Sequence, residues 1–377
     1  MEHIEKIQKI CADVVAPGAS RHDKEGSFST EAIEALSASG LMGLMVSKDL
    51  GGMGLGPRAL AAVVSTLAEA DASVAMVYLM HVLGATSIQT GGASFAPILK
   101  DVAAGKHLST LAFSEAGSRS HFWAPVSKAE KVENGIRLTA RKSWVTSAGH
   151  AHSYVVSAQS FDATAPTEST LWLVKKGTPG LSVAAPWDGM GLRANDSSPM
   201  TLEGVSLTEA DRLTADKTGF KTMLEVVLPL FNLGSAAVAL GLCRAAVGAT
   251  ATHLRTAQFE HIGGQKLGEA LPNLRAQLAE MQIRTDLLGA LVDDLVNHLE
   301  TPNDRTVLRV LEAKAAGGET AIFVTSLAMR TCGGAAFSKH TSVERIFRDA
   351  HAGAVMAPTA DVLRELIGRA LLGMPLF

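Results

Sequence analysis

The sequence predicts an α+β protein in which helices come first, a β domain occupies the middle, and a helical bundle forms the last third. Three observations support this order: helical spacing of apolar residues over the first hundred residues, a strong hairpin signal at Asn134-Gly135, and a return of helical spacing after Asp216. We therefore expect an N-terminal α-helical domain at 1–108, a middle β domain at 109–215 and a C-terminal α-helical domain at 216–377.

In the first domain, Ser29 or Thr30 can cap a helix that ends at Gly40, where a left-handed residue is favoured. A glycine-rich segment at 51–56 then precedes another helix. Glycine-rich turns before helices can bind phosphate, but this one follows no predicted strand and lacks the Lys-Ser/Thr of a phosphate loop. We interpret it as a tight turn.

The middle domain shows short runs typical of strands. Residues on both sides of Asn134-Gly135 form one hairpin, further strands are expected at 153–158, 170–174 and 200–207, and Pro179-Gly180 marks a turn. We expect an antiparallel β-barrel domain of about a hundred residues.

The last domain begins with an uncharged stretch at 226–243, which approaches the length of a membrane span. Because it contains Pro229 and Asn232, we interpret it as a helix buried in a four-helix-type bundle. A second helix presents one apolar face, and three more are expected at 304–330, 342–350 and 360–372. The residues of that apolar face are Leu274, Leu278, Met281, Leu288, Leu291 and Leu295.

Composition, net charge and cysteine spacing exclude several classes of protein and binding partner. Hydrophobic residues make up 47% and charged residues 19%, which is typical of a compact globular protein. The formal charge of -3 predicts no nucleic-acid or membrane partner. The three cysteines lie far apart without metal-site spacing, so we expect no metal, and with the charged N-terminus they favour a cytoplasmic location.

Several short motifs, in order along nearly the whole chain, resemble those of the acyl-CoA dehydrogenase family of flavoproteins. They are Leu50-Gly51-Gly52-Met53-Gly54-Leu55, Glu69-Ala70-Asp71-Ala72-Ser73, Leu111-Ala112-Phe113-Ser114-Glu115, Lys142-Ser143-Trp144-Val145-Thr146-Ser147, Gly191-Leu192-Arg193-Ala194-Asn195-Asp196, Cys332-Gly333-Gly334 and Glu344-Arg345-Ile346-Phe347-Arg348-Asp349-Ala350. The resemblance matches the order of helical and β regions expected from the residues themselves.

The resemblance implies FAD bound between the β domain and the last bundle. It places the Trp144 ring against the flavin, Thr146 near N5, and Phe113-Ser114 at the pyrimidine edge, where hydrogen-bond donors favour hydride acceptance. The residues that it assigns to the cofactor are Leu111, Phe113, Ser114, Ser120, Trp144, Val145, Thr146, Ser147, Arg330, Gly333, Gly334 and Thr359.

The family's reaction needs a carboxylate base, and here both of its usual positions have changed. Ala357 occupies the position before the last helix, in Ala357-Pro358-Thr359, and Phe231 aligns with the second position. Neither side chain can accept a proton. Asn232 also aligns with an arginine that the family uses on the CoA side of its pocket.

Other residues are candidates for the missing base. Asp361 lies one helical turn beyond Ala357, His351 and His340 lie on the approach to the same loop, and Glu115 belongs to a flavin motif. Lone polar residues near pockets are more often structural, and His81, on an apolar helix, favours a packed core role.

Contacts between subunits have changed as well. The family's Arg-x-x-Phe-Gly motif, which reaches a neighbouring subunit's FAD, becomes 261–265, and its glutamine before Gly-Gly becomes Arg330, which offers a positive charge to the pyrophosphate. We expect a homo-tetramer or homo-dimer, with a hetero-oligomer as the alternative.

Four functions follow from these features. The leading hypothesis is an FAD-dependent oxidoreductase that oxidises an acyl thioester, carried by CoA or an acyl carrier protein, and passes electrons to an acceptor. The alternatives are a non-catalytic or half-site subunit of a hetero-oligomer, a flavin monooxygenase on the same fold, and a binding protein without turnover.

Overall fold

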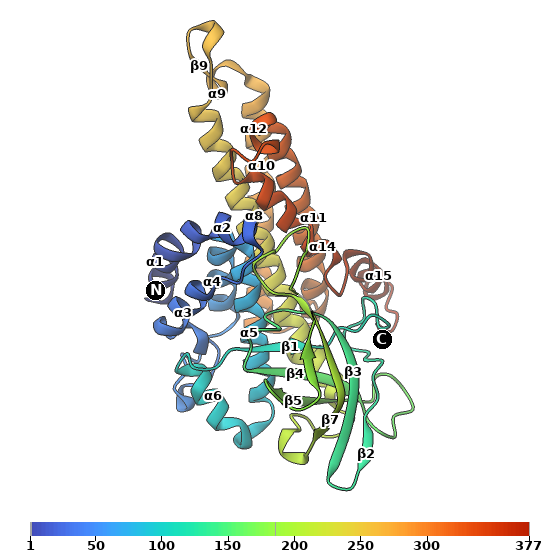
Figure 1. Cartoon of the computed structure of the whole chain (residues 1–377). Coiled ribbons are helices and arrows are strands. Elements are labelled where there is room, and N and C mark those ends of the chain that lie inside the picture. The colour runs from blue at the N-terminus through green and yellow to red at the C-terminus, as the bar shows by residue number, and fades with distance from the viewer. Residues whose placement is uncertain (1, 185, 377) are drawn as a thin grey trace.

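The computed structural model describes residues 2–184 and 186–376. Figure 1 shows helices of the N-terminal part on one side of the β domain and the long C-terminal helices rising beyond both. The predicted order of helices, β domain and helical bundle is confirmed.

The N-terminal part contains α1 (Glu2–Ile10), α2 (Ala16–Glu25), α3 (Thr30–Ser39), α4 (Pro57–Ala70), α5 (Ala72–Gln89) and α6 (Ala96–Ala103). Ser29 occupies the N-cap position of α3 but makes no side-chain cap hydrogen bond, whereas Gly40 ends this helix at φ 78°, as predicted. The glycine-rich segment is a tight turn in which Gly54 donates its N–H to Val46 O at 2.8 Å.

The middle domain consists of two sheets, with strand orders β1-β4-β5 and β2-β3-β7-β6. The strands are β1 (Ser109–Ala112), β2 (Glu130–Val132), β3 (Gly135–Val145), β4 (Ser153–Gln159), β5 (Ser169–Lys175), β6 (Leu181–Val183) and β7 (Ser198–Leu207). The predicted hairpin is present, since Val132 pairs with Gly135. Side chains of both sheets share one core that includes Leu138, Tyr154 and Leu202.

One strand pair differs from the antiparallel prediction. β1 runs parallel to β4, while the other pairs in the two sheets are antiparallel. The physical reason is that the β2–β3 hairpin lies between β1 and β4 in the chain, which provides the long crossover that parallel neighbours require.

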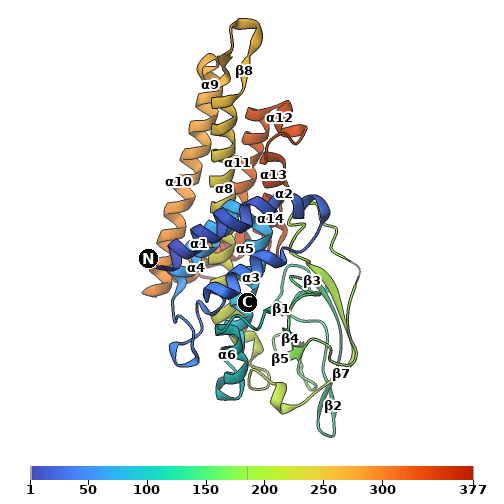
Figure 2. The same ribbon diagram turned by 60° about the vertical axis from the view of Figure 1, so that its left-hand side comes forward.

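The C-terminal part contains α7 (Gly219–Thr222), α8 (Leu228–Thr256), β8 (Gln258–Phe259), β9 (Gln265–Lys266), α9 (Leu267–Ala270), α10 (Pro272–Glu300), α11 (Thr306–Cys332), α12 (Gly334–Phe337), α13 (Val343–Ala350), α14 (Ala352–Val355) and α15 (Ala360–Leu371). In Figure 2, α8 and α10 run side by side, and the segment that joins them projects beyond the rest of the molecule.

Within the described residues, two helices are long and apolar enough to cross a membrane, α5 and the helical segment that includes α8. In each, 83% of the tested window is buried inside the protein. This degree of burial is typical of core helices, and it confirms the predicted buried helix at the start of the bundle.

Contacts at one junction hold the three parts together. Leu192 of the β domain donates its N–H to Asp349 Oδ1 at 2.7 Å, and Arg348 pairs with Asp23 of the N-terminal part at 2.6 Å. A Cβ on Gly191 would lie 2.5 Å from Arg348 O, so only glycine allows this close approach. The β domain therefore has a fixed position against α13.

Candidate flavin site and the altered base positions

The two predicted flavin motifs lie side by side. Glu115 forms an isolated antiparallel bridge with Lys142, and Ser143 donates its N–H to Ser114 O at 2.9 Å. Phe113 is buried, and its ring stacks on Phe122 with centroids 6.2 Å apart. The structure thus brings Phe113-Ser114 next to the strand that carries Trp144, although many residues separate them in the sequence.

Trp144 has a backbone conformation that is rare for a bulky residue. Its φ is 51°, and its indole is 63% exposed, at a register shift between β3 and β7. A left-handed backbone in a bulky residue costs about 1–3 kcal/mol and persists where the surroundings impose it, often at ligand sites. A strained backbone that presents an aromatic face outward fits a residue that stacks on a flat ligand.

The residues after Trp144 are held by the 195–197 loop. Thr146 Oγ1 lies 3.2 Å from Ser197 Oγ, and Ser147, at φ 59°, donates its N–H to Asn195 O at 2.9 Å. Val145, Thr146 and Ser147 are all buried. Leu111 is also buried, in the parallel strand β1. The backbone beside the indole is therefore rigid.

Glu115 is a structural residue. Its carboxylate is 5% exposed and accepts hydrogen bonds from Lys142 Nζ at 2.5 Å and from the Val126 and Ser127 N–H groups at 3.1 and 2.8 Å. Burial lowers the pKa of Lys142, while Glu115 opposes this shift. A carboxylate that accepts this many hydrogen bonds is held in place, and these contacts favour a structural role for Glu115 over the role of a base.

Ser120 and Thr359 meet across the boundary between the β domain and the bundle. Thr359 donates its N–H to Ser120 Oγ at 2.7 Å, and Ser120 Oγ donates to Thr359 Oγ1 at 3.0 Å. Two residues assigned to the cofactor from separate parts of the sequence are therefore direct neighbours.

Arg330, Gly333 and Gly334 lie elsewhere. Arg330 is exposed on the last turn of α11, and Gly334 begins α12, which lies away from the β domain in Figures 1 and 2. The structure does not bring these three residues to Trp144 within one chain. Their contact with FAD stays a prediction.

Asp361 and His351, two of the proposed substitutes for the base, lie in different environments. Asp361 has a side chain that is 95% exposed and lies 3.8 Å from Arg364, so the structure does not place it in a pocket. His351 is partly buried, and its ring packs edge-on against Phe347. His351 Nδ1 lies 2.8 Å from Phe347 O. Since a carbonyl only accepts, Nδ1 carries the hydrogen, and the neutral ring keeps its lone pair on Nε2.

His340 and His81, the other histidines considered from the sequence, form hydrogen bonds to neighbouring groups. His340 lies in an exposed turn, where its Nδ1 is 3.0 Å from Ser338 Oγ. His81 is fully buried, with Nε2 3.0 Å from Met42 O and Nδ1 accepting the Ser109 N–H at 3.1 Å. Burial lowers the pKa of His81 to about 4. The packed core role predicted for His81 is confirmed.

Sequence reasoning missed Lys314. Its side chain is 2% exposed, and its Nζ lies 2.7 Å from Pro358 O and 5.8 Å from the centroid of the Phe231 ring. It therefore contacts both regions from which the family's carboxylate would act. The signal was present in the sequence, because Lys314 is the one charged residue in the run 313–318 of small residues along α11.

Comparisons with known proteins agree with this architecture. The N-terminal, middle and C-terminal domains of acyl-CoA dehydrogenases match residues 2–94, 110–205 and 217–372. The chain belongs to the acyl-CoA dehydrogenase family. The bovine mitochondrial short/branched chain specific acyl-CoA dehydrogenase is 26% identical over 372 residues, which cover 97% of this chain and 84% of that protein.

Solved structures share the fold of this chain. Butyryl-CoA dehydrogenase from Megasphaera elsdenii superposes with a TM-score of 0.91 and 23% identity, covering 98% of this chain and 97% of that one. The structure described as PigA with FAD and proline superposes with a TM-score of 0.89 and 20% identity, covering 98% and 96%.

Proposed function

We propose that this chain is an FAD-dependent oxidoreductase that oxidises an acyl thioester. The observation that carries the proposal is the convergence of Phe113-Ser114, the strained and exposed Trp144, and the Ser120–Thr359 contact. Two similar proteins support it, one described as an acyl-CoA dehydrogenase and one as a complex with FAD. Family membership alone would not assign these residues to a cofactor.

The residues fit a flavin in their chemistry. The Trp144 indole would cover one face of the ring, and the polar groups of Ser114, Thr146 and Thr359 would meet its polar edge. When bound, FAD supplies the acceptor for a hydride. The protein's part is to bind the flavin, to orient the acyl group and to remove its α-proton.

We propose His351 as the group that takes this proton. Of the four candidates, the Glu115 carboxylate is occupied by hydrogen-bond donors, Asp361 faces solvent, and His340 lies in an exposed turn. Among them, only His351 is both partly buried and close in sequence to the Ala357 loop. Its contact with the Phe347 carbonyl places the ring hydrogen on Nδ1, so Nε2 can accept a proton. His351→Gln should slow flavin reduction by about a hundredfold, while FAD binding stays unchanged.

The thioester carrier is proposed to be an acyl carrier protein. Asn232, aligned with the family's CoA-side arginine, is buried and donates its Nδ2–H to Val310 O at 3.0 Å. It therefore points into the bundle and offers no cation to a nucleotide phosphate.

An anaerobic titration tests the reaction and the carrier together. The purified chain, loaded with FAD, is mixed with matched acyl-CoA and acyl-carrier-protein substrates, and loss of the flavin absorption is followed. We expect loss of absorption with both and a faster rate with the carrier protein. A faster rate with acyl-CoA would contradict the carrier assignment, and no loss with any acyl thioester would contradict the dehydrogenase.

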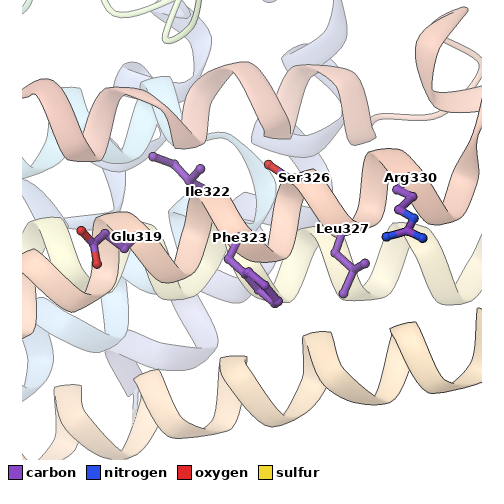
Figure 3. A pocket seen from close by; sticks show the side chains of 6 residues that line it. All are labelled: Glu319, Ile322, Phe323, Ser326, Leu327 and Arg330. Atoms are coloured by element: carbon purple, nitrogen blue, oxygen red, sulfur yellow. The ribbon is translucent and has the colours of Figure 1, made fainter.

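We also propose that α11 packs against a second copy of the chain. Figure 3 shows side chains of α11 along a shallow groove of about 500 Å³. Phe323 of α11 is 44% exposed, and Ile283 and Leu287 of the adjoining helix α10 are 53% and 63% exposed. Exposed apolar side chains on adjoining helices are typical of a subunit interface. The lining residues are Glu319, Ile322, Phe323, Ser326, Leu327 and Arg330. Sedimentation should show an oligomer that Phe323→Glu dissociates.

A further inference from the structure

Lys314 is a buried lysine in α11 that contacts the loop before the last helix. Its Nζ donates hydrogen bonds to Pro358 O at 2.7 Å and Met356 O at 3.0 Å, with a longer contact of 3.4 Å to Gly353 O. The Phe231 ring lies 5.8 Å away on another side. All these contacts come from elements far from Lys314 in the sequence.

These contacts match what an ammonium group can offer. A lysine has three donors and no acceptor, and here three carbonyl oxygens surround it. Among residues 2–184 and 186–376, no carboxylate forms an ion pair with Lys314. Two of the carbonyls, those of Gly353 and Met356, belong to α14 and the residue after it, where a helix end carries partial negative charge. The hydrogen bonds of the Lys314 side chain therefore all go to this loop, and the Phe231 ring lies on another side.

Close helix packing seats the loop on α11. Gly318 lies one helical turn beyond Lys314, and a Cβ there would come within 3.2 Å of Ala354 N and of Gly353 C. Any larger residue would push α14 away from α11. Lys314 and Gly318 thus fix the same loop at neighbouring points.

The loop leads directly to the flavin side of the site. Pro358, whose carbonyl Lys314 binds, precedes Thr359, and Thr359 donates its N–H to Ser120 Oγ at 2.7 Å. A continuous set of hydrogen bonds therefore runs from α11, through the loop, to the β domain.

We propose that Lys314 is a positioning residue that holds the 353–358 loop on α11 and thereby fixes Thr359 against Ser120 at the flavin edge. The role at the flavin rests on the proposed function, whereas the role in the loop does not. In the family, this loop ordinarily carries the base. Here Ala357 gives the loop no charge, and Lys314 of α11 holds the loop in place.

Hydrogen exchange of the chain without flavin tests the loop directly. In Lys314→Met, the amides of Met356 and Thr359 should exchange about tenfold faster than in wild type, a change equivalent to about 1.4 kcal/mol in local opening. Lys314→Arg keeps the charge and donors, so it should recover part of the protection. Unchanged exchange in Lys314→Met would overturn the proposal.

A matched control separates loop positioning from damage to the bundle. Thr325 is buried on the same helix and bonds only within it, to Ala321 O at 2.7 Å. Thr325→Val should leave exchange at Met356 and Thr359 unchanged. If it accelerates exchange as much as Lys314→Met, the effect is general destabilisation, and the positioning role is rejected.

A flavin titration tests whether Lys314, by holding the loop, also supports FAD binding. FAD affinity, measured by quenching of flavin fluorescence, should fall about tenfold in Lys314→Met and partly return in Lys314→Arg. Faster loop exchange with unchanged FAD affinity would reject the link to the flavin. If wild type binds no FAD at all, the proposed function fails, while the exchange result still decides the role of Lys314 in the loop.

Discussion

Two buried lysines, Lys142 and Lys314, have different partners for their side-chain nitrogen. Lys142, beside the flavin motifs, pairs with the Glu115 carboxylate at 2.5 Å, whereas Lys314, beside the altered base positions, has only carbonyl oxygens and the face of Phe231 around it. Burial lowers the pKa of both, to about 7 for Lys314.

The difference shows how the two sides of the site have diverged. On the flavin side, the Lys142–Glu115 pair joins the two segments that carry the flavin motifs. On the base side, no carboxylate remains at Ala357 or Phe231, and a single cation holds the loop. The two buried lysines therefore mark different environments on the two sides of the candidate site.

The largest expected effect comes from breaking the Lys142 pair. Glu115→Ala should lower the free energy of unfolding by about 3–5 kcal/mol, because it leaves a buried ammonium uncompensated. It also removes the acceptor for the Val126 and Ser127 N–H groups. Urea unfolding followed by circular dichroism measures the change.

A double variant serves as the control. Glu115→Leu combined with Lys142→Met removes both charges and should recover part of the lost stability. A loss below about 1 kcal/mol in Glu115→Ala would mean that the pair is not the main anchor of these strands.

Lys314→Met should cost less, about 1–3 kcal/mol near neutral pH, because it removes donors from carbonyls but also removes a buried charge. The pH dependence has a definite sign. Since the pKa of folded Lys314, about 7, lies below the ordinary 10.5, the unfolded chain binds more protons between these values. Wild-type stability relative to Lys314→Met should therefore rise from pH 7 towards 10.5 in urea titrations. A flat difference would contradict the low pKa.

Trp144→Gly should change the free energy of unfolding and the affinity for FAD in opposite directions. Glycine adopts φ 51° without strain, and the indole is 63% exposed, so the chain without flavin should gain about 1 kcal/mol. FAD affinity should fall at least about tenfold, as the stacking surface is lost. Trp144→Phe, which keeps a ring, is the control. Equal FAD affinity in all three proteins would remove Trp144 from the flavin site.

The smallest effect is expected at Asp361. Because its side chain is 95% exposed, Asp361→Asn should change the free energy of unfolding by less than about 0.5 kcal/mol. Stopped-flow flavin reduction should also be unaffected, in contrast to His351→Gln. A hundredfold slower reduction in Asp361→Asn would restore it as the base.

The fold was largely predictable from local patterns. Short stretches of sequence specify the helical spacing, the Asn134-Gly135 turn and the left-handed Gly40. The parallel pairing of β1 with β4 was not, because it depends on a distant strand that no local pattern specifies.

The site was predictable in its members but only partly in their roles. The family resemblance assigned Ser120 and Thr359 to the cofactor, but their contact with each other depends on how α15 approaches the β domain. The left-handed conformation of Trp144 is not readable from sequence, since no glycine marks it. Lys314 was overlooked because charged residues are usually exposed, and only the packing of α11 buries it.

The central claim is that the convergent motifs form a flavin site, and equilibrium binding of FAD to the purified chain tests it most directly. Titration followed by flavin fluorescence and absorption should show saturable binding of one FAD per chain, weakened by Trp144→Gly. A chain that stays colourless and leaves flavin fluorescence unchanged, at protein concentrations where it is folded and oligomeric, would contradict the claim.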